Sequence, residues 1–293
     1  MTMEQHTSLT APIGPKGPDW AQLTLEETWP DKLNLTQWSG WRALLRTFMS
    51  RKRCRVQLPD NLPGRALIPK YALQEFHNLP NGNYSRRFSR GYITGFDFMM
   101  RGTMSTARAW IAHRLQHCLF VADVGTAGGR TAAAVKNAGV PYVWGIDPSP
   151  YLLQHAAADF PEIEFIPGIA EQLPFNDHQL DGLSLCFVLH EIPPRYVEQA
   201  MREFFRVLRP GGRLAIVEPS AAQMHLPRWR FLMHHHGWRH LYFAMLAKLA
   251  HEPFVHAWHA ADKTILFKES GFNLLEEHAG MPFHCWLAEK AQF

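Results

Sequence analysis

Residues Val121 to Ala132 read Val-Ala-Asp-Val-Gly-Thr-Ala-Gly-Gly-Arg-Thr-Ala, and this stretch decides the fold. The run from Cys118 to Val124 is short and apolar, with β-branched residues toward its end, a pattern that predicts a buried parallel strand. A glycine-rich turn follows, and a helical run opens at Arg130. The stretch therefore predicts a strand, loop and helix of the kind that binds a nucleotide.

The spacing of the glycines separates two classes of nucleotide. Dinucleotide folds use Gly-x-Gly-x-x-Gly, because the pyrophosphate sits against backbone amides at the helix N-terminus. Here Gly125 is followed by Ala127, and Gly128 and Gly129 fall outside that register. Asp123 would repel a pyrophosphate but attract a ligand that carries an ammonium and a sulfonium. The charge pattern therefore favours S-adenosylmethionine.

Further segments resemble, in order, the class I S-adenosylmethionine-dependent methyltransferases, in the small-molecule branch that includes the ubiquinone and menaquinone C-methyltransferases. The segments are Asp123-x-Gly125-x-x-x-Gly129, Val143–Asp147, Gly168–Phe175, Asp181–Leu189 and Arg206–Glu218. The resemblance is close from about Leu119 to Pro219 and looser in the C-terminal segment. Several ordered matches are far more specific than one glycine loop.

The resemblance implies an α/β fold with a Rossmann-like seven-stranded sheet, mostly parallel with an antiparallel last strand, and helices on both faces. We expect an N-terminal extension over 1–60, partly ordered, and a helical cap over 61–117. The S-adenosylmethionine-binding core then covers 118–293, with a helical lid insertion at about 222–262. A hairpin at Phe272–His278 and Phe283–Glu289 should close the sheet.

The positions that match the family's motifs are the predicted cofactor-binding residues. Gly125 and Gly129 let the backbone approach the methionyl part of the cofactor, where a Cβ would collide. Asp147 ends the second strand, where α/β nucleotide folds place an acid that accepts the ribose hydroxyls. The full set is Asp123, Gly125, Thr126, Ala127, Gly129, Asp147, Pro148, Ile169, Ala170, Glu171 and Phe187.

The adenine-side loop departs from the family pattern, which has Gly-Asp-Ala-Glu where this chain has Gly168-Ile-Ala-Glu171. Ile169 cannot accept a hydrogen bond from the adenine amino group. A backbone carbonyl, Glu171 or water would take over that contact, and the main-chain amide of Ala170 is expected to contact the ring.

The fourth predicted strand leads into His190 and Glu191, and open α/β sheets bind ligands at the carboxyl ends of their strands. We therefore expect both residues to face the cleft as catalytic residues. A base is needed only when the acceptor must lose a proton, because in-line methyl transfer mainly requires alignment and exclusion of water. His190 suits a base at neutral pH; its alternatives are a hydrogen bond to the cofactor or capping of the next turn.

The segment before the first strand predicts a short helix near Tyr71 to Phe76, a turn at Asn81–Ser85 and an amphipathic helix at Met104–Leu115. In the resembling family such a cap covers the acceptor pocket. The predicted substrate-binding residues are His77, Tyr84, Tyr92 and His190, with Tyr71, Phe76 and Phe96 as further candidates. The alternative is that these aromatics form the core of the cap.

The histidine patterns do not predict a metal site. His113 and His117, like His236 and His240, share a helix face, but convergent further ligands are not evident. The stretch His251-Glu-Pro-Phe-Val-His256 misses the His-Glu-x-x-His spacing by one residue and contains a proline. We expect no metal cofactor.

Composition indicates a globular chain. It has 293 residues, 46% of them hydrophobic, a formal charge of +4 and four scattered cysteines. The mild charge does not demand nucleic acid, and scattered thiols suit a reducing compartment. Met1 to Trp20 is polar and broken by prolines, unlike a secretory signal. We expect a cytoplasmic protein, monomeric or homodimeric.

Two segments leave alternatives open. The basic run Arg51–Arg55 could touch RNA or an anionic membrane, or be a solvated helix end. The aromatic and basic stretch Leu226–His259 fits a lid, a peripheral membrane contact, a helical hairpin or a dimer contact.

The expected activity is methyl transfer to a small, largely apolar or aromatic acceptor, without a nucleic-acid partner. The alternatives are methylation of RNA or protein, and a cofactor-binding protein without catalysis.

Overall fold

The computed structural model describes residues 14–49, 55–75, 79–225, 229, 237–250 and 253–292. Its strands are β1 (Phe120–Val124), β2 (Tyr142–Asp147), β3 (Glu164–Pro167), β4 (Leu180–Cys186), β5 (Leu208–Pro219), β6 (Phe272–His278) and β7 (Phe283–Lys290). The helices before the sheet are α1 (Trp38–Met49), α2 (Arg86–Met99) and α3 (Thr103–Leu115), with short 3₁₀ helices η1 (Arg65–Leu67) and η2 (Lys70–Ala72). The later ones are α4 (Arg130–Asn137), α5 (Pro150–Asp159), η4 (Leu189–Glu191), α6 (Pro194–Val207), α7 (Ala222–His225), α9 (Gly237–Ala250), α10 (Val255–Ala260) and α11 (Lys263–Glu269).

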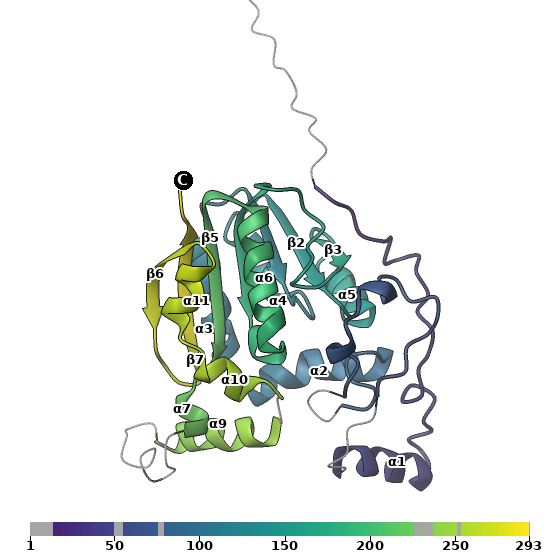
Figure 1. Cartoon of the computed structure of the whole chain (residues 1–293). Coiled ribbons are helices and arrows are strands. Elements are labelled where there is room, and N and C mark those ends of the chain that lie inside the picture. Colours follow the sequence, from purple (N-terminus) through teal and green to yellow (C-terminus); the bar gives the residue numbers. More distant parts are fainter. Residues whose placement is uncertain are drawn as a thin grey trace, which may run out of the picture.

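The strands form one seven-stranded sheet in the order β3-β2-β1-β4-β5-β7-β6 (Figure 1). The pairs from β3 to β5 are parallel, and β7 is antiparallel to both β5 and β6. This confirms the predicted sheet, including its antiparallel last strand. The chain order reverses between β1 and β4, the position at which open α/β sheets form a ligand crevice.

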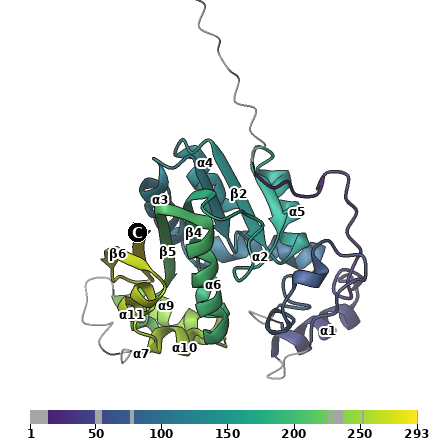
Figure 2. The same cartoon turned by 45° about the horizontal axis from the view of Figure 1, so that its top comes forward.

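Helices cover both faces of the sheet, as Figures 1 and 2 show. Side chains on a strand point alternately to opposite faces. Val121 of β1 accordingly packs in one core cluster with α3, α4 and α5, and Ala122 packs in another with α6 and α11. The predicted helices on both faces are confirmed, and each face of the sheet packs against its own helical layer.

The N-terminal segment lies along the edge strand β3 and its neighbour β2. Trp20 is buried, and its Nε1 donates a 2.8 Å hydrogen bond to the carbonyl oxygen of Phe165. The amide of Gly17 donates to Oε1 of Glu164 at 2.7 Å. The first described residues are therefore part of the packed structure.

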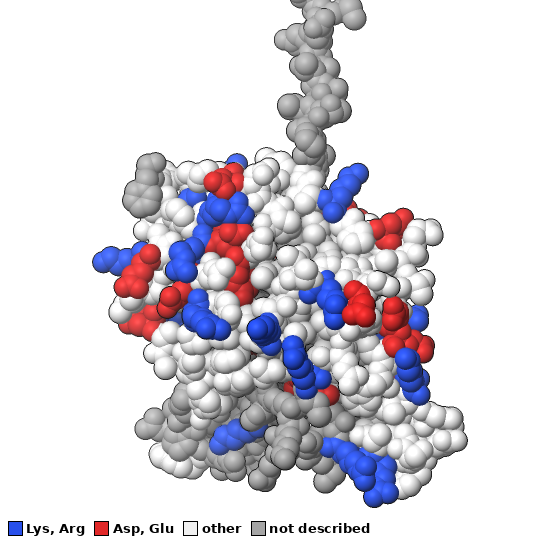
Figure 3. Space-filling view, turned by 45° about the vertical axis from the view of Figure 1, so that its right-hand side comes forward, with Lys and Arg blue, Asp and Glu red and all other residues white. Residues whose placement is uncertain are grey.

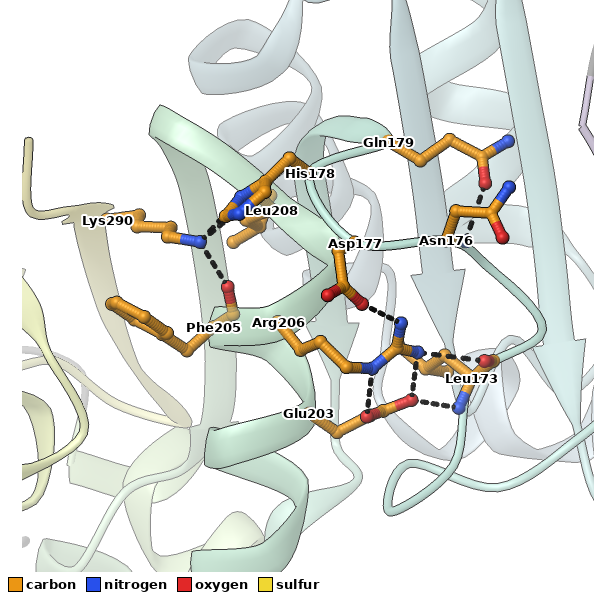
Figure 4. A network of polar contacts seen from close by, with 10 residues as sticks. All are labelled: Leu173, Asn176, Asp177, His178, Gln179, Glu203, Phe205, Arg206, Leu208 and Lys290. Carbon is orange, nitrogen blue, oxygen red and sulfur yellow. Dashed lines mark hydrogen bonds and ion pairs between the residues drawn. The ribbon is translucent and has the colours of Figure 1, made fainter.

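A polar network fixes the chain between β3 and β4 onto α6 (Figure 4). Arg206 donates to Glu203 at 2.7 and 2.8 Å and to Asp177 at 2.7 Å. Glu203 also accepts from the amide of Leu173 at 2.7 Å. Lys290, at the end of β7, donates to the carbonyl of Phe205 at 2.6 Å. These bonds hold the connection that follows the predicted adenine-side loop.

The cap differs locally from the prediction. Two 3₁₀ helices replace the expected short helix near Tyr71 to Phe76, because Pro69 and the left-handed Gly64 (φ 69°) break the segment. The predicted residues Phe76, His77 and His234–His236 and most of the basic run 51–55 lie outside the described residues. Within the described part of the chain, no helix has the length and apolar character to cross a bilayer.

Candidate active site

The carboxyl ends of β1, β2 and β4 meet at a pocket with a cavity volume of about 170 Å³. Its floor comes from the glycine loop after β1, the end of β2 and the turn after β4, and α2, α3 and η2 cover it. Of the predicted cofactor-binding residues, eight line it: Gly125, Thr126, Ala127, Asp147, Pro148, Ile169, Ala170 and Phe187. The predicted residues Asp123, Gly129 and Glu171 lie behind this lining instead.

The glycine loop needs both of its predicted glycines, because a side chain at either position would collide with a neighbouring side chain of the protein. Gly125 and Gly129 have φ values of 69° and 75°, in the left-handed region. A Cβ on Gly125 would lie 2.5 Å from Cγ2 of Val188, and one on Gly129 would lie 2.8 Å from Cζ of Phe165. The space that these glycines leave is filled by neighbouring side chains of the protein itself.

Asp123 shapes the loop from behind. Its carboxylate accepts hydrogen bonds from Oγ1 of Thr126 at 2.6 Å, Oγ of Ser184 at 2.7 Å and the amide of Ala132 at 3.2 Å. Burial raises its pKa to about 6, against the effect of these donors. These bonds brace the loop, and the expected contact of Asp123 to the cofactor stays a prediction.

Asp147 is the buried acid that lines the pocket at the end of β2. Its Oδ2 accepts from the amide of Ala127 at 2.9 Å, and its Oδ1 accepts from the amide of Ser149 at 2.8 Å. Burial raises its pKa to about 7, even though both amide donors favour the charged form. Each oxygen keeps a further lone pair for a hydroxyl donor in the pocket.

The adenine-side wall combines Ile169 and Ala170 with the N-terminal cap. The hydroxyl of Tyr71 donates a 2.6 Å hydrogen bond to Oε1 of Glu171, and the Tyr71 ring lines the pocket. That ring also packs against Tyr196, with ring centroids 5.0 Å apart. Glu171 thus holds Tyr71 in the wall of the pocket.

A charged cluster that sequence reasoning missed lies on the α3 side of the pocket. Asp97 of α2 accepts two hydrogen bonds from Arg108 of α3, at 2.8 and 2.7 Å, and one from Arg130 at the start of α4. Both arginines line the pocket, so two positive charges face one negative charge. The available signal was that Arg108 lies in the apolar stripe of α3 with Met104, Ile111 and Leu115, where an arginine needs a polar partner.

The turn after β4 separates the two predicted catalytic residues. Glu191 lines the pocket, but His190 is buried outside its lining. The imidazole Nδ1 of His190 is hydrogen-bonded to Glu218, which also accepts from the amides of Val188 at 2.9 Å and Leu189 at 2.7 Å. The expectation that His190 faces the cleft is corrected, because Glu218 at the end of β5 holds the ring beneath the turn.

Aromatic side chains from α2 and from the segment before it complete the pocket. Tyr71, Tyr84, Tyr92 and Phe96 line it, and Phe96 contacts Phe187 edge-on with ring centroids 5.8 Å apart. Burial and the nearby charge of Asp147 raise the pKa of Tyr84, which is therefore a neutral phenol. Tyr84 lies beside the acid of β2, whereas Tyr92 and Phe96 lie together in α2.

No cluster of three or more His, Cys, Asp or Glu side chains with the geometry of a metal site occurs among the described residues. The prediction of no metal cofactor remains a prediction.

Part of the pocket lining belongs to a segment that resembles known proteins. Residues 122–216 match the family model "Methyltransferase domain". The chain is 38% identical over 99 residues to a demethylmenaquinone methyltransferase of Chlorobaculum tepidum, covering 34% of this chain and 40% of the relative. It is 36% identical over 124 residues to a demethylmenaquinone methyltransferase of Listeria welshimeri, covering 40% of this chain and 51% of the relative. The matched part thus spans about half or less of these relatives.

A solved structure of a methyltransferase described as SAM dependent, from Aquifex aeolicus, aligns with a TM-score of 0.43 at 17% identity. The alignment covers 59% of this chain and 82% of that one.

Proposed function

Because residues 122–216 form a class I S-adenosylmethionine-dependent methyltransferase domain of the ubiquinone and menaquinone C-methyltransferase type, we propose that the protein transfers a methyl group from S-adenosylmethionine to a small, largely apolar or aromatic acceptor. The observation that carries the proposal is Asp147, a buried acid that closes β2 and lines the pocket beside the glycine loop.

The chemistry of the pocket fits S-adenosylmethionine. Asp147 has lone pairs free for the ribose hydroxyls, and Ile169 with Ala170 offers an apolar wall for the adenine ring. Arg108 and Arg130 supply the positive charge that the carboxylate of the methionyl part requires. When bound, the cofactor supplies a methyl group on a sulfonium, which is electrophilic without help from a metal.

The protein's own part in the reaction is alignment, exclusion of water and proton removal. Phe187 and Phe96 form a close aromatic wall beside the glycine loop, where an apolar acceptor ring would be held. We assign to Glu191 the role of the base that takes a proton from the acceptor, because it is the predicted catalytic residue that lines the pocket. His190, buried on Glu218, positions the turn that carries Glu191.

The acceptor that fits best is a ring of the phenol or quinone type. The aromatic and apolar lining of Tyr92, Ile93, Phe96 and Phe187 suits a planar apolar ring. Two of the relatives are named demethylmenaquinone methyltransferases, and an acceptor of this class agrees with those names. Methylation of a polymer has no support from the basic run 51–55, most of which lies outside the described residues.

The test is to incubate the purified protein with methyl-labelled S-adenosylmethionine and an extract of its host, and then to separate lipids, polar metabolites, RNA and protein. We expect the label in the organic-soluble fraction. A Glu191→Gln variant should lose the transfer while it retains cofactor binding in calorimetry. Label in RNA or protein would contradict a small acceptor. Binding without label in any fraction would favour a protein that binds the cofactor without catalysis.

A further inference from the structure

Helix α1 presents an apolar stripe to solvent. Trp38, Trp41 and Leu45 follow the spacing i, i+3, i+7 and therefore share one helix face. All three are exposed, and Trp38 has 74% of its surface accessible. Leu44, about a quarter-turn around the helix from this stripe, is buried and attaches the helix to the molecule. The helix thus keeps Trp38, Trp41 and Leu45 outside the core, which is the reverse of the usual arrangement.

A second exposed apolar group is formed by α9 and the end of α2. Trp238 and Met245 of α9 lie seven residues apart on one face, and Trp238 is 79% exposed. Phe98, near the end of α2, is 85% exposed. The two helices are joined because the hydroxyl of Tyr242 donates a 2.7 Å hydrogen bond to the carbonyl of Met99. These side chains therefore belong to one connected surface.

Both groups lie at the same end of the molecule. Figure 1 shows α1 and α9 at the end opposite the C-terminus, with α2 between them and nearer the sheet. This is the end at which the parallel strands finish and the pocket forms. Phe98 follows the pocket-lining Phe96 by two residues. The docking face is defined here as Trp38, Trp41 and Leu45 together with Phe98, Trp238 and Met245.

The charges on these helices have one sign. Helix α1 carries Arg42 and Arg46, and α9 carries Arg239 and Lys248, and neither helix contains Asp or Glu. In Figure 3 the lowest described part of the surface carries blue and white side chains, whereas the red ones lie higher. Exposed tryptophans flanked by basic residues are the pattern of helices that lie in a membrane interface.

We infer that the docking face binds the surface of an anionic lipid bilayer, with α1 and α9 lying in the interface. A second copy of the chain is the weaker occupant, because a symmetric contact would bring four basic helices together without an acidic partner. The basic side chains instead complement anionic head groups, while the tryptophans enter the boundary between head groups and acyl chains.

The consequence for the pocket rests on the proposed function. An apolar acceptor resides in the bilayer. Docking through the end of α2 would bring the aromatic lining of the pocket close to the acceptor molecules in that bilayer. Binding to lipid itself does not depend on methyl transfer, so the two proposals can fail separately.

The test is co-sedimentation of the full chain with vesicles of phosphatidylcholine, with and without phosphatidylglycerol. We expect binding to the anionic vesicles that weakens as salt is raised. The variants Trp38→Ser/Trp41→Ser/Leu45→Ser and Phe98→Ser/Trp238→Ser/Met245→Ser should each lower the partition coefficient at least about tenfold, since each removes large apolar surface from the interface. The matched control is Leu119→Ser/Tyr142→Ser, which removes exposed apolar side chains at the amino ends of β1 and β2.

Thermal unfolding and calorimetry with S-adenosylmethionine accompany each variant, so that loss of fold or of cofactor binding is distinguished from loss of docking. The inference is overturned if the wild type binds neutral and anionic vesicles equally, or if the control variant loses as much binding as the docking-face variants. It is also overturned if the wild type ignores vesicles but forms dimers that the docking-face variants disperse.

Discussion

At the scale of single residues, Asp147 combines burial with a position on the pocket wall. We expect Asp147→Ala to weaken binding of S-adenosylmethionine by about 1 to 3 kcal/mol, because the hydrogen bonds to the ribose are lost. Isothermal calorimetry at neutral pH measures the change. Asp159→Ala, at the solvent-exposed end of α5, is the control and should leave the affinity unchanged. Equal affinities for wild type and Asp147→Ala would remove the residue from the cofactor site.

The raised pKa of Asp147 makes both stability and binding depend on pH. Burial raises this pKa to about 7, so the ligand-free fold holds the proton more tightly than the unfolded chain does. The contribution of Asp147 to the free energy of unfolding therefore falls as pH rises from about 4 to about 7. Hydroxyl donors favour the charged form, and cofactor binding near pH 6.5 should release a proton. Calorimetry in buffers of different ionisation enthalpy detects the release, and Asp147→Asn should abolish it.

We propose that Arg108 binds the carboxylate of the methionyl part of S-adenosylmethionine. Arg108→Met keeps the apolar stem but removes the charge, and it should weaken binding of S-adenosylmethionine by about 1.5 to 3 kcal/mol. The affinity for decarboxylated S-adenosylmethionine should change little, because that ligand lacks the group that Arg108 binds. Arg90→Met, an exposed position on α2, serves as the control. Equal losses for both ligands would place Arg108 in a purely structural role.

The residues of the pocket were predictable where a backbone motif fixes them. The glycine loop after β1, Asp147 at the end of β2 and the pair Ile169 and Ala170 after β3 each follow from local spacing along a single strand and its turn. The hydrogen-bond partners of Asp123 and His190 were not predictable, because Ser184 and Glu218 lie on other strands farther along the chain. Sequence spacing places a residue at a strand end, but hydrogen bonds from other strands decide where its side chain points.

At the scale of elements, the turn after β4 depends on one carboxylate from β5. Glu218→Gln keeps the size but replaces the charged carboxylate with a neutral amide, which weakens the hydrogen bonds to the amides of Val188 and Leu189 and to His190. We expect the free energy of unfolding to fall by about 2 kcal/mol, measured by urea denaturation. The exposed Glu269→Gln at the end of α11 is the control. An unchanged unfolding curve would show that the turn holds without Glu218.

Periodicity and short apolar runs predict the elements that pack on one another, and the exceptions share a cause. Helix α6 has a clear 3.6-residue pattern of apolar residues, and β1 is a short, buried apolar run. The stretch around η1 and η2 has no such pattern, since its shape comes from packing against the core, such as the bond from Tyr71 to Glu171. Local propensity is a weak guide where tertiary contacts supply the order.

At the scale of the whole molecule, the N-terminal segment is held by Trp20. Trp20→Ala removes a buried ring and its bond to Phe165, and should lower the free energy of unfolding by about 3 kcal/mol with little change in cofactor affinity. Trp38→Ala removes the same side chain from an exposed position and should change stability by less than about 0.5 kcal/mol. Denaturant unfolding of both variants provides the comparison. Equal free energies of unfolding for Trp20→Ala and Trp38→Ala would show that Trp20 does not stabilise the attachment of the segment to the sheet.

The mostly parallel sheet was predictable because the ordered motifs of the resembling family span its parallel part. The attachment of residues 14–31 was not, since nothing in a polar, proline-broken segment identifies the distant strand on which it lies. The presence of Trp20 and Trp29 in the segment hinted only that it packs somewhere.

The bond between Trp20 and Phe165 joins residues 145 positions apart. During synthesis the N-terminal segment leaves the ribosome long before its docking strand exists. At about 5 to 20 residues per second, the delay is roughly 7 to 30 s. Throughout that interval the aromatic side chains of the nascent segment have no native surface to cover them and stay open to non-native contacts.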